Sequence, residues 1–124
     1  DGIYAASLLV EMIAVSGKKL SEIAEDIRKE YGEIHMEERA YRFTLEEKER
    51  IQKVLMEDKG LPELPFAADH VSYLDGCKVD FQNGGWVSAR FSGTEPLLRI
   101  FCEMETEHEA VQVCEIFEEY LHLR

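Results

Sequence analysis

The hydrophobic and polar positions divide the chain into two parts. Residues 3–15 are apolar on nearly every side, and a helix of this kind must be covered on several faces. Two interpretations stay open: the segment closes a preceding domain, or it is a central helix of the domain that follows. After a break at residues 16–19, apolar positions at helical spacing predict a second helix as far as Tyr31, capped by Ser21 and ended by Gly32.

The remainder of the chain predicts an α+β domain. Imperfect alternation over residues 34–43 predicts a strand near a sheet edge, where its charges discourage unwanted pairing. A hydroxyl followed three residues later by a glutamate forms a capping box, which predicts helices beginning at Thr44 and Thr106. Period-two alternation and turn signals predict four more strands, at residues 71–74, 77–81, 86–91 and 97–104. Short connections favour antiparallel neighbours, so we expect an antiparallel sheet with two helices on one face.

Composition narrows the functional classes. The 124 residues suffice for one modest domain and leave room for a fragment of a neighbour. With 45% hydrophobic and 32% charged residues, the composition is that of a soluble globular protein. The net charge of −12 argues against nucleic-acid binding, so any phosphate site must be local. No stretch is long enough to span a membrane, and we expect no membrane partner.

The cysteines and histidines predict no metal centre. Cys77, Cys102 and Cys114 are widely spaced without a CxxC motif, which favours reduced thiols in a cytoplasmic protein over zinc ligands. The four histidines are scattered, and no Asp-x-Asp cluster or Ser/His/Asp arrangement is visible. We therefore expect no metal ligand and no catalytic residue in this chain.

One stretch, residues 90–99 (RFSGTEPLLR), carries candidate chemistry. A Ser-Gly-Thr turn between two strands exposes backbone N–H groups and two hydroxyls, and such a cluster can hold an anion. Arginines on both sides suit phosphate because their planar forks donate paired hydrogen bonds. The alternative is an ordinary hairpin turn with solvated arginines.

Strand alternation refines this prediction. Val87 and Ala89 are core-like, so Arg90 projects from the other face of its strand, and Arg99 on the partner strand can lie across from it. Two neighbouring arginines repel, which is tolerable if an anion lies between them. In the absence of a ligand, Glu95 could pair with either arginine.

The same stretch closely resembles the phosphate-binding loop of the α-D-phosphohexomutases, the family of phosphoglucomutase, phosphomannomutase and phosphoglucosamine mutase. The resemblance extends back through residues 75–79 and 85–87 and reaches the start of the chain at residues 1–9. It therefore covers nearly the whole chain, although only the loop is strongly diagnostic.

The resemblance implies a domain organisation. Residues 34–124 correspond to the family's fourth, C-terminal domain, with a fold like that of the TATA-box-binding protein. Residues 1–17 correspond to the closing helix of the third domain, and residues 18–33 to a connector helix. The family's phosphoryl-carrying serine, magnesium-binding aspartate loop and sugar-selecting loop do not appear here. We therefore expect part of a longer enzyme, inactive alone, with magnesium bound outside this chain and no cofactor within it.

The resemblance also implies a function and site residues. The family interconverts hexose 1-phosphate and 6-phosphate through a bisphosphate intermediate, and the fourth domain grips the substrate's phosphate. Its partners would be a hexose phosphate and the other three domains of the same polypeptide. The matching phosphate-binding residues are Arg90, Ser92, Gly93, Thr94 and Arg99. Glu95 and Pro96 match as loop-shaping residues, whereas Phe91 stands where the family often has proline.

Two alternatives to a phosphoglucomutase/phosphomannomutase domain remain open. The first is a phosphoglucosamine mutase domain, because the sugar-selecting loop lies outside the chain. The second is a non-catalytic module whose acidic helices dock a basic partner.

Overall fold

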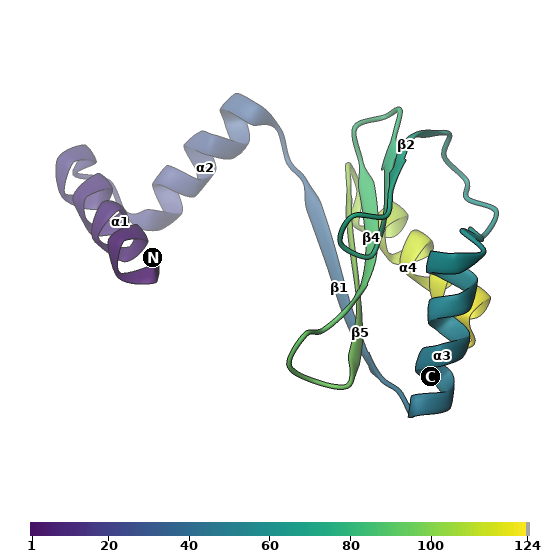
Figure 1. Cartoon of the computed structure of the whole chain (residues 1–124). Helices are drawn as coiled ribbons and strands as arrows, with labels where there is room; N and C mark the ends of the chain where they lie inside the picture. The colour runs from purple at the N-terminus through teal and green to yellow at the C-terminus, as the bar shows by residue number, and fades with distance from the viewer. Residues whose placement is uncertain (124) are drawn as a thin grey trace. The chain divides into compact units, whose positions relative to one another are not determined.

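The computed structural model describes residues 1–123 and divides the chain into two units, Asp1–Glu33 and Ile34–Arg124. The first unit consists of two helices, α1 (Gly2–Ser16) and α2 (Leu20–Tyr31) (Figure 1). No residue of α1 is buried. Both interpretations of this segment, as the closing helix of a preceding domain or as a central helix of the following one, stay predictions.

Helix α2 begins earlier than the sequence predicted. Its N-cap is Lys19, so the expected cap at Ser21 is wrong. The Glu22 carboxylate accepts a hydrogen bond from the Lys19 backbone N–H at 2.7 Å. The side chain of the third helical residue thus caps the start of the helix, because it satisfies a backbone N–H that would otherwise lack a partner. The predicted end at Gly32 is confirmed.

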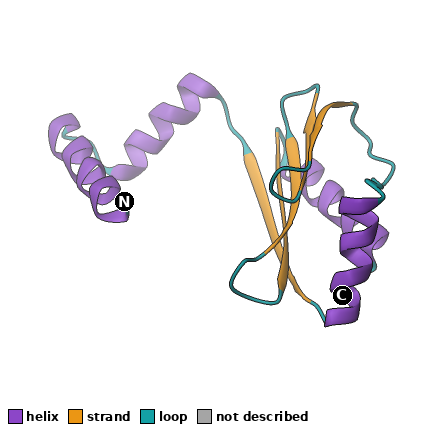
Figure 2. Cartoon of the chain, viewed as in Figure 1, coloured by secondary structure: helices purple, strands orange, loops and turns teal. Residues whose placement is uncertain are grey.

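The second unit is built on a five-stranded antiparallel sheet with the order β1-β5-β4-β3-β2 (Figure 2). The strands are β1 (His35–Arg42), β2 (Ala68–Ser72), β3 (Cys77–Phe81), β4 (Trp86–Phe91) and β5 (Leu97–Met104). The α+β fold class is therefore confirmed, and β1 lies at an edge of the sheet as its charges predicted.

Two helices cover one face of this sheet (Figure 1). They are α3 (Leu45–Gln52), which continues as a π-helical turn η1 (Lys53–Glu57), and α4 (Glu107–Leu121). Both predicted capping boxes are confirmed, because Thr44 and Thr106 each accept from the backbone N–H three residues later. The glutamates at those third positions accept from the cap N–H groups in return.

The core lies between the helices and the covered sheet face. Alternate residues of the central strands point into it, which leaves the other face of the sheet open. The fully buried side chains of β4 and β5 are Val87, Ala89, Leu98, Ile100, Cys102 and Met104. Phe117 of α4 is the largest fully buried side chain in the same core. Side-chain alternation therefore sends the intervening residues, Arg90 and Arg99 among them, to the open face.

All three cysteines are buried and free, which agrees with reduced core thiols. Burial raises the pKa of the Cys77 thiol to about 11. At neutral pH this side chain is therefore protonated and packs as a small apolar group.

Strand β2 differs from the prediction of residues 71–74. It spans Ala68–Ser72, and Leu74 lies in the following turn, almost fully exposed. The pairing with β3 explains the shift, because Ala68 lies opposite Phe81 and extends the ladder upstream, with an irregularity before His70. Tyr73, outside the ladder, donates its hydroxyl to the Lys59 carbonyl oxygen.

An ion cluster joins β1 to α4. Arg39 bridges Glu37 and Glu118 at 2.8 and 2.7 Å, and the Tyr41 hydroxyl donates to Glu118. Burial opposes ionisation of Glu118, but the hydrogen bonds from Tyr41 and Arg39 outweigh it and lower the pKa of its carboxyl group. The cluster therefore ties the edge strand to the helix layer through groups that are charged at neutral pH.

Candidate functional site

The predicted loop connects β4 to β5 and projects from the end of the sheet on the side away from the helices (Figure 1). Arg90 and Arg99 are direct partners in the β4–β5 register, as the sequence predicted. Both leave the open face, because Ala89 and Ile100 beside them are fully buried in the core. The open face of the sheet therefore carries two arginines that are direct partners on adjacent strands.

The loop backbone is closed by two short hydrogen bonds. The Ser92 N–H donates to the Leu97 carbonyl oxygen, and the Leu97 N–H donates to that of Glu95, both at 2.8 Å. The Thr94 N–H has only a long contact of 3.5 Å with the Ser92 hydroxyl. Within the described part of the chain, the N–H groups of Gly93 and Glu95 have no acceptor. The turn therefore offers backbone donors that a bound anion could satisfy.

Phe43, just beyond β1, anchors both ends of the loop. Its ring meets Phe91 edge to face, with 5.3 Å between the ring centroids. Its backbone N–H donates to the Pro96 carbonyl oxygen at 3.3 Å. Phe91, which stands where the resemblance would often place proline, is thus fixed at the start of the loop by an aromatic contact.

Carboxylates pair with both arginines. Arg90 Nη1 lies 2.7 Å from Asp75 Oδ2, and Arg99 Nη2 lies 3.3 Å from Glu95 Oε2. Glu38 lies 3.9 Å from Arg99 Nη1. The expectation that Glu95 pairs with an arginine is confirmed for Arg99, whereas Asp75 and Glu38 were missed.

Arg99 is incompletely satisfied in this position. Its Nε is covered from solvent and has no hydrogen-bond partner among the described residues. A buried donor without a partner costs about 1–3 kcal/mol. Its pairs with Glu95 and Glu38 are long and lie at the surface, where such pairs stabilise little. A small movement of Arg99 toward an anion therefore loses little stabilising free energy.

The loop and the arginines enclose a hollow of about 530 Å³. Its lining residues are Arg90, Ser92, Gly93, Thr94, Arg99 and Phe101. The structure thus brings together all five residues predicted to bind phosphate, although their binding role stays a prediction. Glu95 and Pro96 belong to the loop but do not line the hollow. Phe101, the one aromatic side chain of the lining, was missed.

A glycine holds the Asp75 turn against Arg90. Gly76 has a φ of +81°, and a Cβ on it would lie 2.5 Å from the Ala89 carbonyl oxygen and 2.6 Å from the Arg90 Cβ. Only glycine fits this close approach without strain. The Asp75–Gly76 turn therefore places a carboxylate within reach of the guanidinium.

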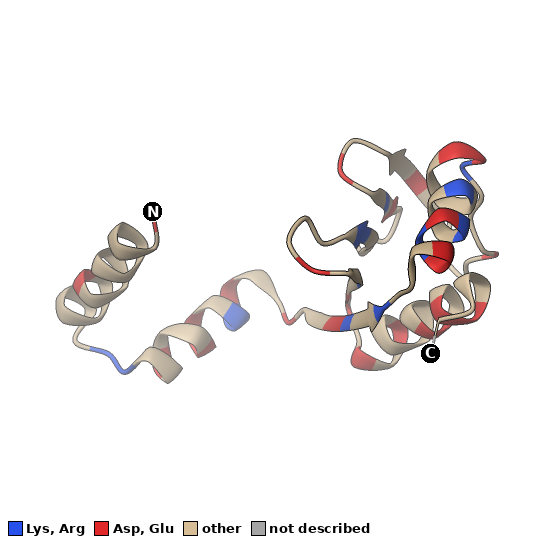
Figure 3. Cartoon of the chain, turned by 60° about the horizontal axis from the view of Figure 1, so that its bottom comes forward, with Lys and Arg blue, Asp and Glu red and all other residues tan. Residues whose placement is uncertain are grey.

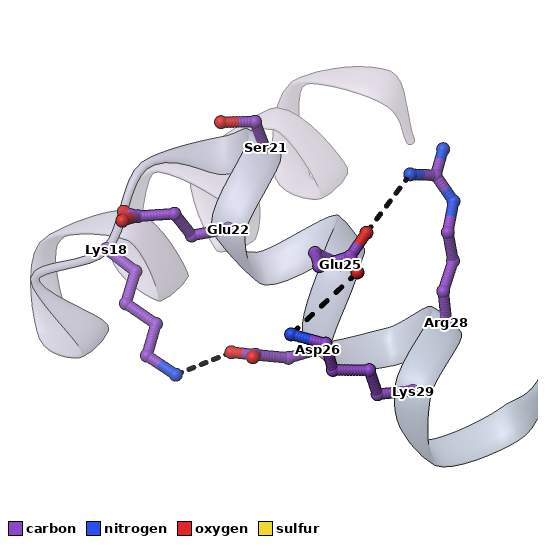
Figure 4. A pocket seen from close by; sticks show the side chains of 7 residues that line it. All are labelled: Lys18, Ser21, Glu22, Glu25, Asp26, Arg28 and Lys29. Atoms are coloured by element: carbon purple, nitrogen blue, oxygen red, sulfur yellow. Dashed lines mark hydrogen bonds and ion pairs between the residues drawn. The ribbon is translucent and has the colours of Figure 1, made fainter.

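A second hollow lies on α2 in the first unit (Figure 4). Its charged side chains pair with one another: Lys18 with Asp26 at 2.5 Å, and Glu25 with both Arg28 and Lys29. These ion pairs are about half exposed to solvent. The hollow therefore consists of mutually neutralised surface charges, which give it no preference for a ligand of either sign.

Other kinds of site find no support in the described residues. Acidic residues recur along both helices of the second unit (Figure 3), but in residues 1–123 no three His, Cys, Asp or Glu side chains are placed to hold a metal ion. Within the same range, no helix combines the length and apolar character needed to cross a membrane.

Fold and loop together define a class: a two-layer α+β domain with an open sheet face that ends in a hairpin loop flanked by opposed arginines. Comparison with known families identifies it further. Residues 34–119 match the family described as "Phosphoglucomutase/phosphomannomutase, C-terminal domain". The chain belongs to this family, and the second unit is its C-terminal domain, as the loop resemblance indicated.

Individual relatives agree with this assignment. The chain is 35% identical over 121 residues to a phosphoglucomutase/phosphomannomutase of Thermococcus kodakarensis, covering 94% of this chain and 23% of the relative. It is 32% identical over 119 residues to a probable phosphoglucosamine mutase of Methanopyrus kandleri, covering 94% and 24%. A phosphoglucosamine mutase of Geobacillus kaustophilus is 32% identical over 108 residues, covering 86% and 20%. The chain thus spans about a quarter or less of these relatives' length.

Proposed function

We propose that this chain binds the phosphate group of a hexose phosphate, as the C-terminal part of a phosphohexomutase that interconverts hexose 1-phosphate and 6-phosphate through a bisphosphate intermediate. The observation that carries the proposal is the direct pairing of Arg90 with Arg99 at the base of a loop with unpaired backbone donors. Opposed cations without a shared carboxylate are favourable once an anion lies between them. Planar guanidinium forks suit the oxygens of phosphate.

In this proposal the chain binds and orients but performs no bond-breaking step. Ser92 and Thr94 supply hydroxyl donors, Gly93 a backbone donor, and the arginines the charge. A binding site that must hold either phosphate of a reorienting bisphosphate needs moderate affinity and must tolerate differences in ligand geometry. A surface loop provides both better than a rigid buried cage. Closure of such a domain over the substrate would also exclude water from phosphoryl transfer.

The rest of the reaction belongs to the longer polypeptide implied by the relatives' length. We propose that the phosphoryl-carrying serine, the magnesium ion and the sugar-selecting contacts lie there, and that this chain alone is inactive. The donor set of residues 1–123 does not fit a metal ion, so no step in this chain is assigned to magnesium. Relatives carry both mutase names, and the preferred sugar follows from residues outside this chain.

The first test is an NMR titration of the chain at about pH 7.5, where a phosphate monoester is mostly a dianion. Saturable amide shifts at residues 92–94 and at Arg99 with inorganic phosphate and glucose 1-phosphate, and none with glucose, are expected. Arg90→Ala should weaken phosphate binding by roughly 10- to 150-fold, because charge-assisted hydrogen bonds contribute about 1.5–3 kcal/mol.

Lys53→Ala is the matched control. Lys53 lies in η1 and pairs with Asp58 at 2.8 Å, so its removal deletes one exposed cation and one ion pair away from the loop. Phosphate affinity should then change by less than about twofold. The proposal fails if the unsubstituted chain shows no response to phosphate, or if both variants weaken binding equally.

A further inference from the structure

The open sheet face continues beyond the two arginines and changes character. Along β5 the next residue on this face is Phe101, and its direct partner on β4 is Ser88. Neither is buried in the core, whereas Ile100 and Cys102 on either side of Phe101 are fully buried. Phe101 therefore lies on the open face, in the row adjacent to the arginine pair.

The same row ends in a carboxylate. Glu38 on the edge strand β1 is the direct partner of Phe101 on the side opposite Ser88. Glu38 is exposed and makes only a long contact, 3.9 Å, with Arg99. The row thus presents an aromatic ring between a carboxylate, which accepts hydrogen bonds, and a hydroxyl, which both donates and accepts them.

This arrangement matches the chemistry of a sugar ring. A hexose has patches of C–H groups, which pack on an aromatic face, and a rim of hydroxyls, which need donors and acceptors. Successive residues on one strand face are about 6.6–6.8 Å apart. A phosphate between the arginines would therefore place the ring of its ester over the next row, at Phe101. Phe101 already lines the same hollow as the phosphate-binding candidates.

We propose that Phe101 is a sugar-binding residue: its ring packs on the hexose attached to the phosphate held by the loop, while Glu38 and Ser88 flank the hydroxyls. The inference rests on the proposed function, because it needs a phosphate at the loop. It adds a contact with the sugar itself from this domain. Inorganic phosphate lacks the ring and gains nothing from Phe101, which provides the test.

The experiment measures the affinities of inorganic phosphate and glucose 1-phosphate by NMR titration for the unsubstituted chain and for Phe101→Ala. The unsubstituted chain should bind the sugar phosphate more tightly. Phe101→Ala should weaken glucose 1-phosphate binding by about fourfold, the factor expected for one methylene-sized loss of apolar contact. Phosphate binding should change by less than about twofold.

Met36→Ala is the control, because Met36 is an exposed apolar residue of the same open face, on β1 opposite Glu103 and outside the hollow. It should leave both affinities unchanged. If Phe101→Ala gives no dispersed amide spectrum, Phe101→Leu keeps the apolar volume without the ring and should show a smaller loss in the same direction.

The outcomes separate the two proposals. Equal affinities of the unsubstituted chain for the two ligands, or an equal effect of the Phe101 substitutions on both, overturn the sugar contact and leave phosphate binding standing. An unsubstituted chain that binds neither ligand overturns the proposed function, and the sugar contact with it. Selective loss of glucose 1-phosphate affinity supports both.

Discussion

Removing a negative charge at Asp75 should strengthen phosphate binding. Asp75 pairs with Arg90, with 2.7 Å between its Oδ2 and Nη1 of the arginine. An anion that binds Arg90 must either displace this carboxylate or share the guanidinium with it. Asp75→Asn keeps the shape of the side chain but removes the competing charge, so the arginine becomes a better hydrogen-bond donor to phosphate.

The magnitude follows from the exposure of the pair. The Arg90 and Asp75 side chains are 47% and 77% exposed, and pairs of this kind contribute about 0.2–1 kcal/mol. Because the ligand must overcome at most this free energy, the affinity for phosphate should rise by about 1.4- to 5-fold. Loss of repulsion between the carboxylate and the phosphate acts in the same direction. Both effects should diminish in about 1 M salt, where the screening length falls to about 3 Å.

The assay is a phosphate titration of the chain followed by amide shifts of the loop, at low and at high salt. Asp58→Asn is the control, since it changes the net charge equally and breaks an exposed pair with Lys53. An equal gain in both variants would show a general charge effect. Weaker binding in Asp75→Asn would refute the competition argument and assign Asp75 the task of orienting Arg90.

Two further predictions concern stability. Gly76→Ala should lower the free energy of unfolding by more than about 1 kcal/mol, because φ is +81° and the new Cβ would lie 2.6 Å from the Arg90 Cβ. In the control Gly93→Ala, whose Cβ meets nothing within 4 Å, the loss measured by urea unfolding should be less than about 0.5 kcal/mol. Equal losses in the two variants would contradict the strain at Gly76. Glu118 has a folded-state pKa below the ordinary 4.5, so its contribution is present above that pH and is lost as the pH falls through the lowered value. Glu118→Gln should therefore reduce the loss of unfolding free energy as the pH falls. The control Glu115→Gln, at an exposed position of the same helix, should leave this pH dependence unchanged. An unchanged pH dependence of stability in Glu118→Gln would refute the role of the cluster.

The sequence predicted features that depend on near neighbours. Alternation along 86–91 assigned Val87 and Ala89 to the core and Arg90 to the other face, and a short loop brought Arg99 across from it. The capping boxes were confirmed for the same reason, since each involves residues three apart. Strand alternation and capping boxes are both determined by residues within a few positions of one another in the sequence.

Features that depend on pairing between distant segments were harder to predict from the sequence. The true extent of β2 follows from its register with β3, and the Asp75–Arg90 pair from the close approach of a glycine turn to β4. Phe101 shares a strand face with Arg99, so alternation could have indicated it. Its position in the hollow, however, depends on how the loop folds over the sheet. Such features are fixed by tertiary packing, which local patterns do not specify.

The acidic partners of the arginines explain how a chain of net charge −12 can carry an anion site. Arginines that are direct partners on adjacent strands repel, and Asp75, Glu95 and Glu38 compensate that repulsion through exposed pairs that each contribute at most about 1 kcal/mol. A phosphate dianion bound by both arginines forms charge-assisted hydrogen bonds of about 1.5–3 kcal/mol each. The exchange therefore favours the ligand, but only by the difference between these values. Binding should accordingly be reversible and moderate, which is what the proposed role with a reorienting substrate would require.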